Sequence, residues 1–153
     1  MHWLEHLVPP PLVALLIAIA MWAMARVVAP LEAPPALRIA VAAALAVAGI
    51  GFDLAGFLAF RRAGASIDPY RIDKGEALVT QGVYRYTRNP MYLGLALVLL
   101  GYSVYLIRPV DFLGPLIFLV YITRFQILPE ERAMTRKFGA RYEAYTRAVR
   151  RWI

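Results

Sequence analysis

Four apolar runs, separated by short basic segments, constrain the fold of this chain more than any other feature. The runs cover residues 12–28, 37–60, 90–107 and 112–128. A helix that crosses a bilayer needs roughly 20 predominantly apolar residues, so each run is a candidate span. Hydrophobic residues make up 61% of the chain, and their clustering is not that of a water-soluble domain. The sequence therefore predicts an all-α integral membrane protein with one domain over residues 1–153.

The connections between these runs predict two local features. The first run lacks a clear small-residue cleavage site, so we expect it to be a retained span. The last two runs are joined only by residues 108–111, which predicts a tight helical hairpin. Gly49 and Gly51 lie inside the second run, where small residues favour close packing of helices.

The basic residues predict the orientation in the membrane. Fourteen of the 17 lysines and arginines lie either between the second and third runs or from the end of the fourth run onward. Because loops rich in Lys and Arg stay in the cytoplasm, a multi-pass protein with both termini cytoplasmic is predicted. The net charge is +7, but the basic residues flank apolar runs, so membrane lipids are expected as partners and nucleic acid is not.

Residues 129–153 form a segment of a different kind. Apolar side chains recur there at spacings of three and four, and basic side chains fill the positions between them. This pattern predicts one basic amphipathic helix on the cytoplasmic membrane surface. The chain contains no cysteine, which excludes disulfides and thiolate chemistry, and no cluster has the spacing of metal ligands, so no metal site is predicted.

The start of the third run has the composition of an anion site. Asn89 is predicted to be a helix N-cap and Pro90 the first helical residue. The free backbone N–H groups of such a turn, together with Arg85 and Arg88, would attract a carboxylate or phosphate. The alternative is a well-capped helix with ordinary interfacial tyrosines and arginines.

Two consecutive acids follow the fourth run. Glu130 and Glu131 are predicted to lie in the first turn of the tail helix, where the helix dipole alone can stabilise them. They also lie where a cation would be held at the membrane face. A ligand with a carboxylate and with ammonium and sulfonium groups would use both segments, and S-adenosylmethionine is such a molecule.

The two segments together resemble the signature of the isoprenylcysteine carboxyl methyltransferase and phospholipid methyltransferase superfamily. The matching positions are Gly82-x-Tyr84-Arg85-x-x-Arg88-Asn89-Pro90-x-Tyr92-x-Gly94, then Glu130-Glu131-Arg132, Phe138-Gly139, Tyr142, Tyr145 and Arg151-Trp152. The resemblance covers residues 77–153 and implies a membrane methyltransferase that uses S-adenosylmethionine and releases S-adenosylhomocysteine. It also implies a lipophilic acceptor, of the prenylcysteine carboxylate or phospholipid amine type; a small thiol stays open as well.

The resemblance further implies a cofactor pocket between the third span and the tail. The implied cofactor-binding residues are Gln81, Gly82, Tyr84, Arg88, Asn89, Tyr92, Leu93, Glu130, Glu131, Tyr142 and Tyr145. Gln81, Gly82 and Tyr84 would lie near the adenosine, and the two glutamates would hold the amino group. The isoprenylcysteine enzymes commonly have His where this chain has Asn89, a departure that phospholipid-type relatives share.

Methyl transfer from a sulfonium is an in-line displacement that mainly requires alignment and exclusion of water. The catalytic candidates are Arg124, Tyr92 and Asp53. Arg124 would orient an anionic substrate group, or would only extend to the headgroups. Asp53 is an acid inside an apolar run, so it would either pair with Arg88 or Arg124 or line the substrate pocket.

Two other functions fit parts of the sequence. A membrane reductase of the sterol-reductase type resembles the same C-terminal region and uses a nicotinamide cofactor, but the short chain argues against it. A non-catalytic membrane subunit that only binds lipid would leave the Asn-Pro helix start and the paired glutamates without a role.

Overall fold

The computed structural model describes residues 8–63 and 78–153, and within these ranges the chain forms helices and no strand. The helices are α1 (Pro10–Met24), α2 (Pro35–Arg62), η2 (Gly82–Arg85), α3 (Pro90–Leu106), η3 (Pro109–Phe112), α4 (Leu113–Ile122), η4 (Thr123–Ile127), α5 (Leu128–Phe138) and α6 (Ala140–Ala148). The all-helical prediction is therefore confirmed for the described residues.

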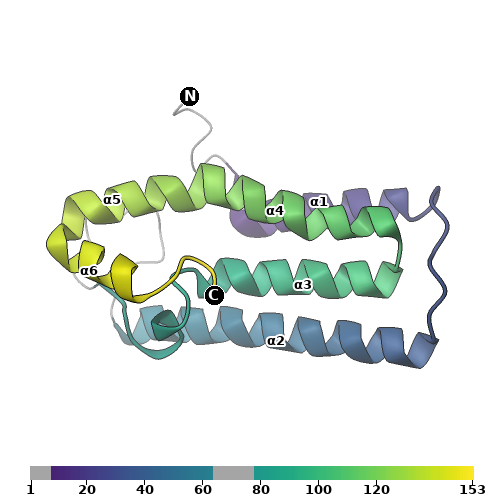
Figure 1. The fold of residues 1–153 in the computed structure, drawn as a ribbon, viewed down its shortest axis with the longest axis horizontal. Coiled ribbons are helices and arrows are strands. Elements are labelled where there is room, and N and C mark those ends of the chain that lie inside the picture. The colour runs from purple at the N-terminus through teal and green to yellow at the C-terminus, as the bar shows by residue number, and fades with distance from the viewer. Residues whose placement is uncertain (1–7, 64–77) are drawn as a thin grey trace.

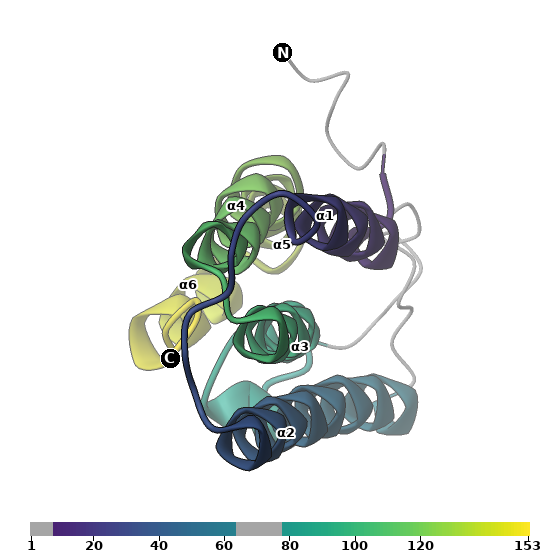
Figure 2. The ribbon, with the colours of Figure 1, turned by 90° about the vertical axis from the view of Figure 1, so that its right-hand side faces the viewer.

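Helix α3 lies at the centre of the arrangement (Figures 1 and 2). Helix α2 packs along one side of α3, whereas α1 and α4 lie on the other side. The α1–α2 connection and the α3–α4 turn share one end of the molecule. Helices α5 and α6, η2 and the C-terminus gather at the opposite end, which we call the polar end (Figure 1).

Proline marks the first turn of three long helices. Pro10, Pro35 and Pro90 each occupy the first helical position, where the missing N–H costs no hydrogen bond. The predicted hairpin between the last two runs is confirmed, because only a short turn and η3 separate α3 from α4. Arg108 fastens this turn to the α1–α2 connection by donating from Nε to the carbonyl oxygen of Val28 at 2.6 Å.

Glycines let α2 and α3 approach backbone to backbone. A Cβ atom added to Gly49 would lie 2.6 Å from the carbonyl oxygen of Gly94, and one added to Gly94 would lie 2.6 Å from that of Gly49. A Cβ on Gly101 would lie 2.8 Å from the carbonyl oxygen of Ala42. The predicted close packing is thus confirmed at Gly49, but it is wrong for Gly51, which faces open space.

Large side chains fill the other side of α3. Phe118, Ile122 and Ile127 are fully buried, and they cluster with Leu99 of α3 and Met21 of α1. The outer faces of α1, α2 and α4 remain apolar and exposed, with side chains such as Val47 and Val120 about 70% accessible. Such a surface fits a lipid environment.

Among residues 8–63 and 78–153, two helices are long and apolar enough to cross a membrane, Pro35–Arg62 and the continuous helix Pro109–Phe138. Helices α1 and α3 are apolar but shorter, with 15 and 17 residues. The described part of the chain therefore has two candidate spans by length and composition. Four spans and cytoplasmic termini stay predictions.

The helix that contains the paired glutamates differs from the prediction in two ways. It does not begin at residue 129, because α4 continues through the π-helix η4 into α5 without a break. The glutamates therefore do not lie at a free helix N-terminus, and stabilisation by a helix dipole does not apply to them. The predicted single helix over 129–153 is also wrong, since Gly139, at φ +50°, separates α5 from α6.

Candidate functional site

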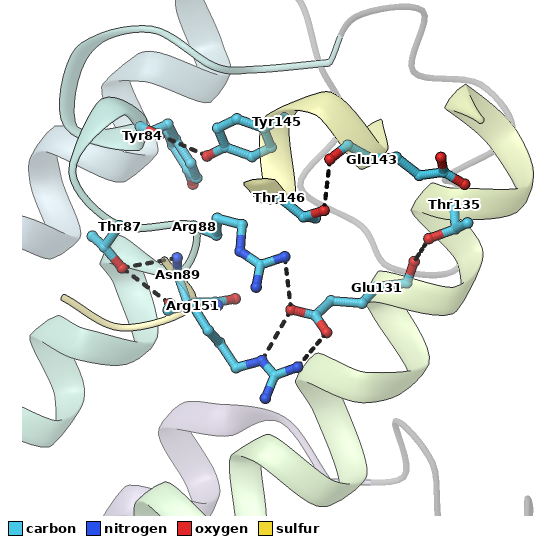
Figure 3. Close-up of polar contacts among 10 residues, drawn as sticks. All are labelled: Tyr84, Thr87, Arg88, Asn89, Glu131, Thr135, Glu143, Tyr145, Thr146 and Arg151. Carbon is cyan, nitrogen blue, oxygen red and sulfur yellow. Dashed lines mark hydrogen bonds and ion pairs between the residues drawn. The ribbon is translucent and has the colours of Figure 1, made fainter. Parts of the chain in front are cut away.

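The start of α3 is held by the last residues of the chain. Asn89 precedes Pro90 at the N-cap position, as predicted, but its side chain makes no capping hydrogen bond. The Asn89 side-chain amide donates instead to the carbonyl oxygen of Arg151 at 2.9 Å. Thr87, which is 1% exposed, donates to the same carbonyl oxygen at 3.2 Å and accepts from the Asn89 N–H at 3.2 Å. The predicted capping by the Asn89 side chain is therefore wrong, because the C-terminal segment supplies a competing acceptor (Figure 3).

Glu131 lies between two arginines (Figure 3). Its Oε1 atom lies 3.2 Å from Arg88 Nη1 and accepts from Arg151 Nε at 3.0 Å, and its Oε2 accepts from Arg151 Nη2 at 2.7 Å. This is the bidentate geometry in which a guanidinium binds a carboxylate most strongly. The hydrogen bond to Glu131 raises the pKa of Arg151, which keeps this side chain charged.

Glu130 has partners of a different kind. The Tyr92 hydroxyl of α3 donates to Glu130 Oε1 at 2.6 Å. Gln126, which is 5% exposed, also hydrogen-bonds to both Tyr92 and Glu130. A phenol and an amide bind this carboxylate without neutralising its charge.

The π-helix η4 explains why Gln126 and Glu130 meet Tyr92. Pro129 has no N–H and would interrupt an α-helix, and the wider η4 turn immediately before it absorbs that interruption. The two polar residues then lie four positions apart on the side that faces α3. Sequence reasoning missed Gln126, although a glutamine close to the end of an apolar run is itself a signal for a functional residue.

Tyrosines connect η2 to α6. Tyr145 of α6 donates its hydroxyl to the carbonyl oxygen of Tyr84 at 2.7 Å, and its ring lies 6.2 Å from that of Tyr142. Burial, followed by the nearby Tyr145 and Glu130, raises the pKa of Tyr84. Burial also raises the pKa of Tyr145 and of Tyr142, so all three phenols stay neutral. The resemblance implies that Tyr142 and Tyr145 close the cofactor pocket, and this role stays a prediction.

The other predicted cofactor residues lie around this junction. Gln81 and Gly82 are exposed at the start of η2, and Gly82 adopts φ +62°, which favours glycine. Leu93 is buried within α3. Arg88, at the junction, pairs with Glu131 and not with Asp53.

Two catalytic candidates lie apart from Tyr92. Asp53 of α2 contacts α3 at Gly94, since a Cβ on that glycine would lie 2.8 Å from Asp53 Cγ. Gly94 and Tyr92 are two residues apart, so they point about 200° apart around the helix axis. Arg124 is exposed, with its guanidinium 5.5 Å from the Phe125 ring. The catalytic roles of Asp53 and Arg124 stay predictions.

A wide-open surface groove of about 580 Å³ lies beside Glu131. Its described lining comes from one face of α5: Leu128, Glu131, Arg132, Thr135 and Arg136. The two signature segments of the sequence, the start of α3 and the paired glutamates, are thus adjacent, with an open surface groove next to Glu131.

A family model described as phospholipid methyltransferase matches residues 37–141, more than half of the chain. The chain belongs to this family. The match includes the start of α3 and both glutamates, and it confirms the superfamily that the two sequence segments indicate. Membership, with the apolar helices, makes the protein a methyltransferase of the membrane type.

Two relatives show how far the similarity extends. An uncharacterised protein of Haemophilus influenzae is 43% identical over 63 residues, which are 41% of this chain and 100% of that protein. The protein-S-isoprenylcysteine O-methyltransferase of Schizosaccharomyces pombe is 34% identical over 80 residues, which are 50% of this chain and 33% of the yeast protein. The chain thus spans about a third of the yeast enzyme. No solved structure matches this chain.

Proposed function

We propose that this family member transfers a methyl group from S-adenosylmethionine to a lipophilic acceptor at the membrane surface. The observation that carries the proposal is the junction at the polar end, where Tyr92 of α3 contacts Glu130 and Arg88 contacts Glu131. This junction joins the two segments that resemble the methyltransferase signature, which lie far apart in the sequence. The family match favours this activity over a nicotinamide-dependent reductase or a lipid-binding subunit.

The residues at the junction fit the charges of this cofactor. The hydrogen-bond donors to Glu130 within the described residues are neutral, so an ammonium or sulfonium group of a ligand would supply the positive charge that stabilises its carboxylate. The Nε–H of Arg88 is buried without a hydrogen-bond partner within the described residues, and it can donate to a carboxylate or hydroxyl of a ligand. We therefore assign the amino group to Glu130 and a polar contact of the methionine portion to Arg88.

Bound S-adenosylmethionine would supply a methyl group activated by the sulfonium charge. Leu93 and Tyr92 would approach the methionine portion from α3, and Gln81, Gly82 and Tyr84 would lie on the adenosine side. The protein itself would align the acceptor with the methyl group and exclude water, and it needs no covalent intermediate for this. The neutral phenols of Tyr84 and Tyr145 would donate hydrogen bonds without adding charge.

The acceptor is proposed to reach the junction from the bilayer. The exposed apolar faces of α2 and α4 would place an acyl or prenyl chain beside the helices, with its polar group near the polar end. The names of the matched family and of the yeast relative, phospholipid methyltransferase and isoprenylcysteine O-methyltransferase, are the basis for a phospholipid amine or a prenylcysteine carboxylate.

Calorimetry with purified protein in detergent tests the cofactor. We expect S-adenosylhomocysteine to bind with a micromolar dissociation constant and a reduced nicotinamide nucleotide to produce no heat of binding. Binding of the nicotinamide nucleotide alone would overturn the proposal. Incubating membranes with cofactor that carries a labelled methyl group, followed by solvent extraction, then identifies the acceptor: label in the lipid fraction is expected, and label confined to soluble products contradicts a lipophilic acceptor.

A further inference from the structure

The C-terminal segment, residues 149–153, crosses the site as an extended strap. It leaves α6 at Val149, which adopts extended backbone angles, and it runs to the start of α3. The Arg88 N–H donates to the carbonyl oxygen of Arg150 at 3.1 Å. Thr87 and Asn89 both donate to the next carbonyl oxygen, that of Arg151. Three consecutive residues before α3 thus bind two consecutive carbonyl groups of the strap.

Glu131 fixes the same strap from the side of α5. Its two carboxylate oxygens accept hydrogen bonds from Nε and Nη2 of Arg151, and Oε1 also pairs with Nη1 of Arg88, so most of its roughly four acceptor sites are used. Arg88 is 12% exposed and Glu131 17% exposed, so the solvent weakens this cluster only in part. Glu130, one residue earlier, has no such pair of arginines among the residues that the structure describes.

We propose that Glu131 and Arg151 are positioning residues which latch the strap over the start of α3, and that Glu131 is not a ligand of the cofactor. The inference rests on the proposed function and narrows it, because it separates the roles of two adjacent acids. Breaking the latch frees the strap, and with it the Asn89 and Arg88 groups that the strap holds in place. The site then loses its shape without losing a direct contact to the ligand.

Two nucleosides distinguish positioning from direct binding. S-adenosylhomocysteine contains the amino-acid portion with its ammonium group, whereas 5′-methylthioadenosine lacks that portion. A residue that binds the ammonium affects only the first nucleoside. A residue that positions the site affects the binding of both. Glu131→Gln and Arg151→Gln are therefore each expected to weaken the binding of both nucleosides by roughly tenfold, which is the effect of losing a charge-assisted hydrogen bond.

The double variant Glu131→Gln/Arg151→Gln tests whether the two residues act through one contact. Its affinities for the two nucleosides are expected to lie within about twofold of those of either single variant, because the first change has already broken the contact between the two residues. Arg150→Gln is the matched control in the same strap, since its side chain is exposed and, within the described residues, donates to the Ile153 carbonyl oxygen at 3.5 Å. Arg151→Lys keeps the charge but not the bidentate geometry, and it should restore part of the affinity.

Hydrogen exchange provides a readout that needs no ligand. The Arg88 amide, which donates to Arg150, is expected to exchange at least tenfold faster in Glu131→Gln and Arg151→Gln than in wild type and Arg150→Gln. Unchanged exchange would overturn the latch. Loss of S-adenosylhomocysteine binding alone in Glu131→Gln, or tighter binding in Arg151→Gln, would overturn the positioning role. If the wild type binds neither nucleoside, the proposed cofactor fails, and the exchange result decides the latch by itself.

Discussion

The two sides of α3 are built on different principles. On the side toward α2, glycines bring two backbones into contact, and Gly49 and Gly94 exclude even a methyl group from each other. On the side toward α4 and α5, large apolar residues surround Phe118, and polar side chains lie at both ends: Ser103 and Asp111 at the α3–α4 turn, and Tyr92 and Glu130 at the polar end. The first side leaves no room for a ligand where the glycines meet, whereas the second ends in a cluster of charged and hydrogen-bonding groups beside an open surface groove.

The difference between the two sides of α3 indicates where a reaction site is expected. A backbone-to-backbone contact stabilises a helix pair in a membrane by dispersion and tolerates no added atoms. A polar cluster at membrane depth is costly unless it has a function or complete hydrogen bonding. The side facing α2 is therefore the scaffold, and the junction of α3 with α5 is the candidate active site.

The largest effect is expected from adding one methyl group on the α2 side. Gly49→Ala should lower the free energy of unfolding by about 3 kcal/mol, because its Cβ would overlap the Gly94 carbonyl oxygen and the backbones cannot separate cheaply. Thermal unfolding in detergent, followed by circular dichroism, measures this change. Gly51→Ala is the matched control on the same helix, since its Cβ would meet open space. The midpoint of thermal unfolding should stay unchanged or rise slightly, because alanine favours a helix more than glycine does. Equal effects of the two changes would contradict the scaffold role.

Removing one hydroxyl on the opposite side should have the next largest effect. Tyr92→Phe deletes the 2.6 Å hydrogen bond to Glu130 and is expected to cost about 2 kcal/mol of stability. The same unfolding assay measures it. Tyr105→Phe, on the exposed part of α3, should change stability by less than about 0.5 kcal/mol. A Tyr92→Phe protein as stable as that control would show that the pair with Glu130 does not form.

A smaller loss is expected where α6 meets η2. Tyr145→Phe removes one hydrogen bond from a neutral phenol to the Tyr84 carbonyl oxygen, which is typically worth about 1 kcal/mol. The comparison is Tyr86→Phe, whose ring is 75% exposed. If Tyr145→Phe lowered the free energy of unfolding more than Tyr92→Phe does, the expected order of the two contacts would be wrong.

The smallest effect is predicted for Asp53, the acid on the side of α3 that faces α2. Asp53→Asn should change the affinity for S-adenosylhomocysteine by less than about twofold, because Asp53 contacts α3 at Gly94, on the side away from Tyr92. Calorimetry with the variant gives the number. A tenfold loss would place a cofactor contact on the α2 side and would remove the distinction between the two faces.

Local sequence signals predicted the parts of the molecule that depend on neighbouring residues. Proline at position 90 and the run that follows it were sufficient to place the start of α3, and the short connection at 108–111 was sufficient to predict the hairpin. Helix α2 runs from Pro35 to Arg62, close to the predicted run of 37–60. The adjacency of the two signature segments came from the resemblance and is confirmed by the contacts of Tyr92 and Arg88.

The features that sequence reasoning missed depend on contacts between distant residues. The sequence around Asn89 suits a side chain that caps the helix. Only the folded chain shows that this side chain donates instead to the carbonyl oxygen of Arg151, 62 positions later. Pro129 after an apolar run is typical of a helix start, yet η4 lets one helix continue through it. Basic residues such as Arg151 look like headgroup contacts in an amphipathic pattern, and their ion pairs with Glu131 have no local signature.

The central claim is that Glu130, at the junction of α3 and α5, binds the charged part of the cofactor. The most direct measurement compares wild type with Glu130→Gln for two ligands, S-adenosylhomocysteine and 5′-methylthioadenosine, by calorimetry. We predict that the variant binds the first roughly tenfold or more weakly and the second with unchanged affinity, because only the first has an ammonium group for the carboxylate. Unchanged binding of S-adenosylhomocysteine by a folded Glu130→Gln protein would contradict the claim.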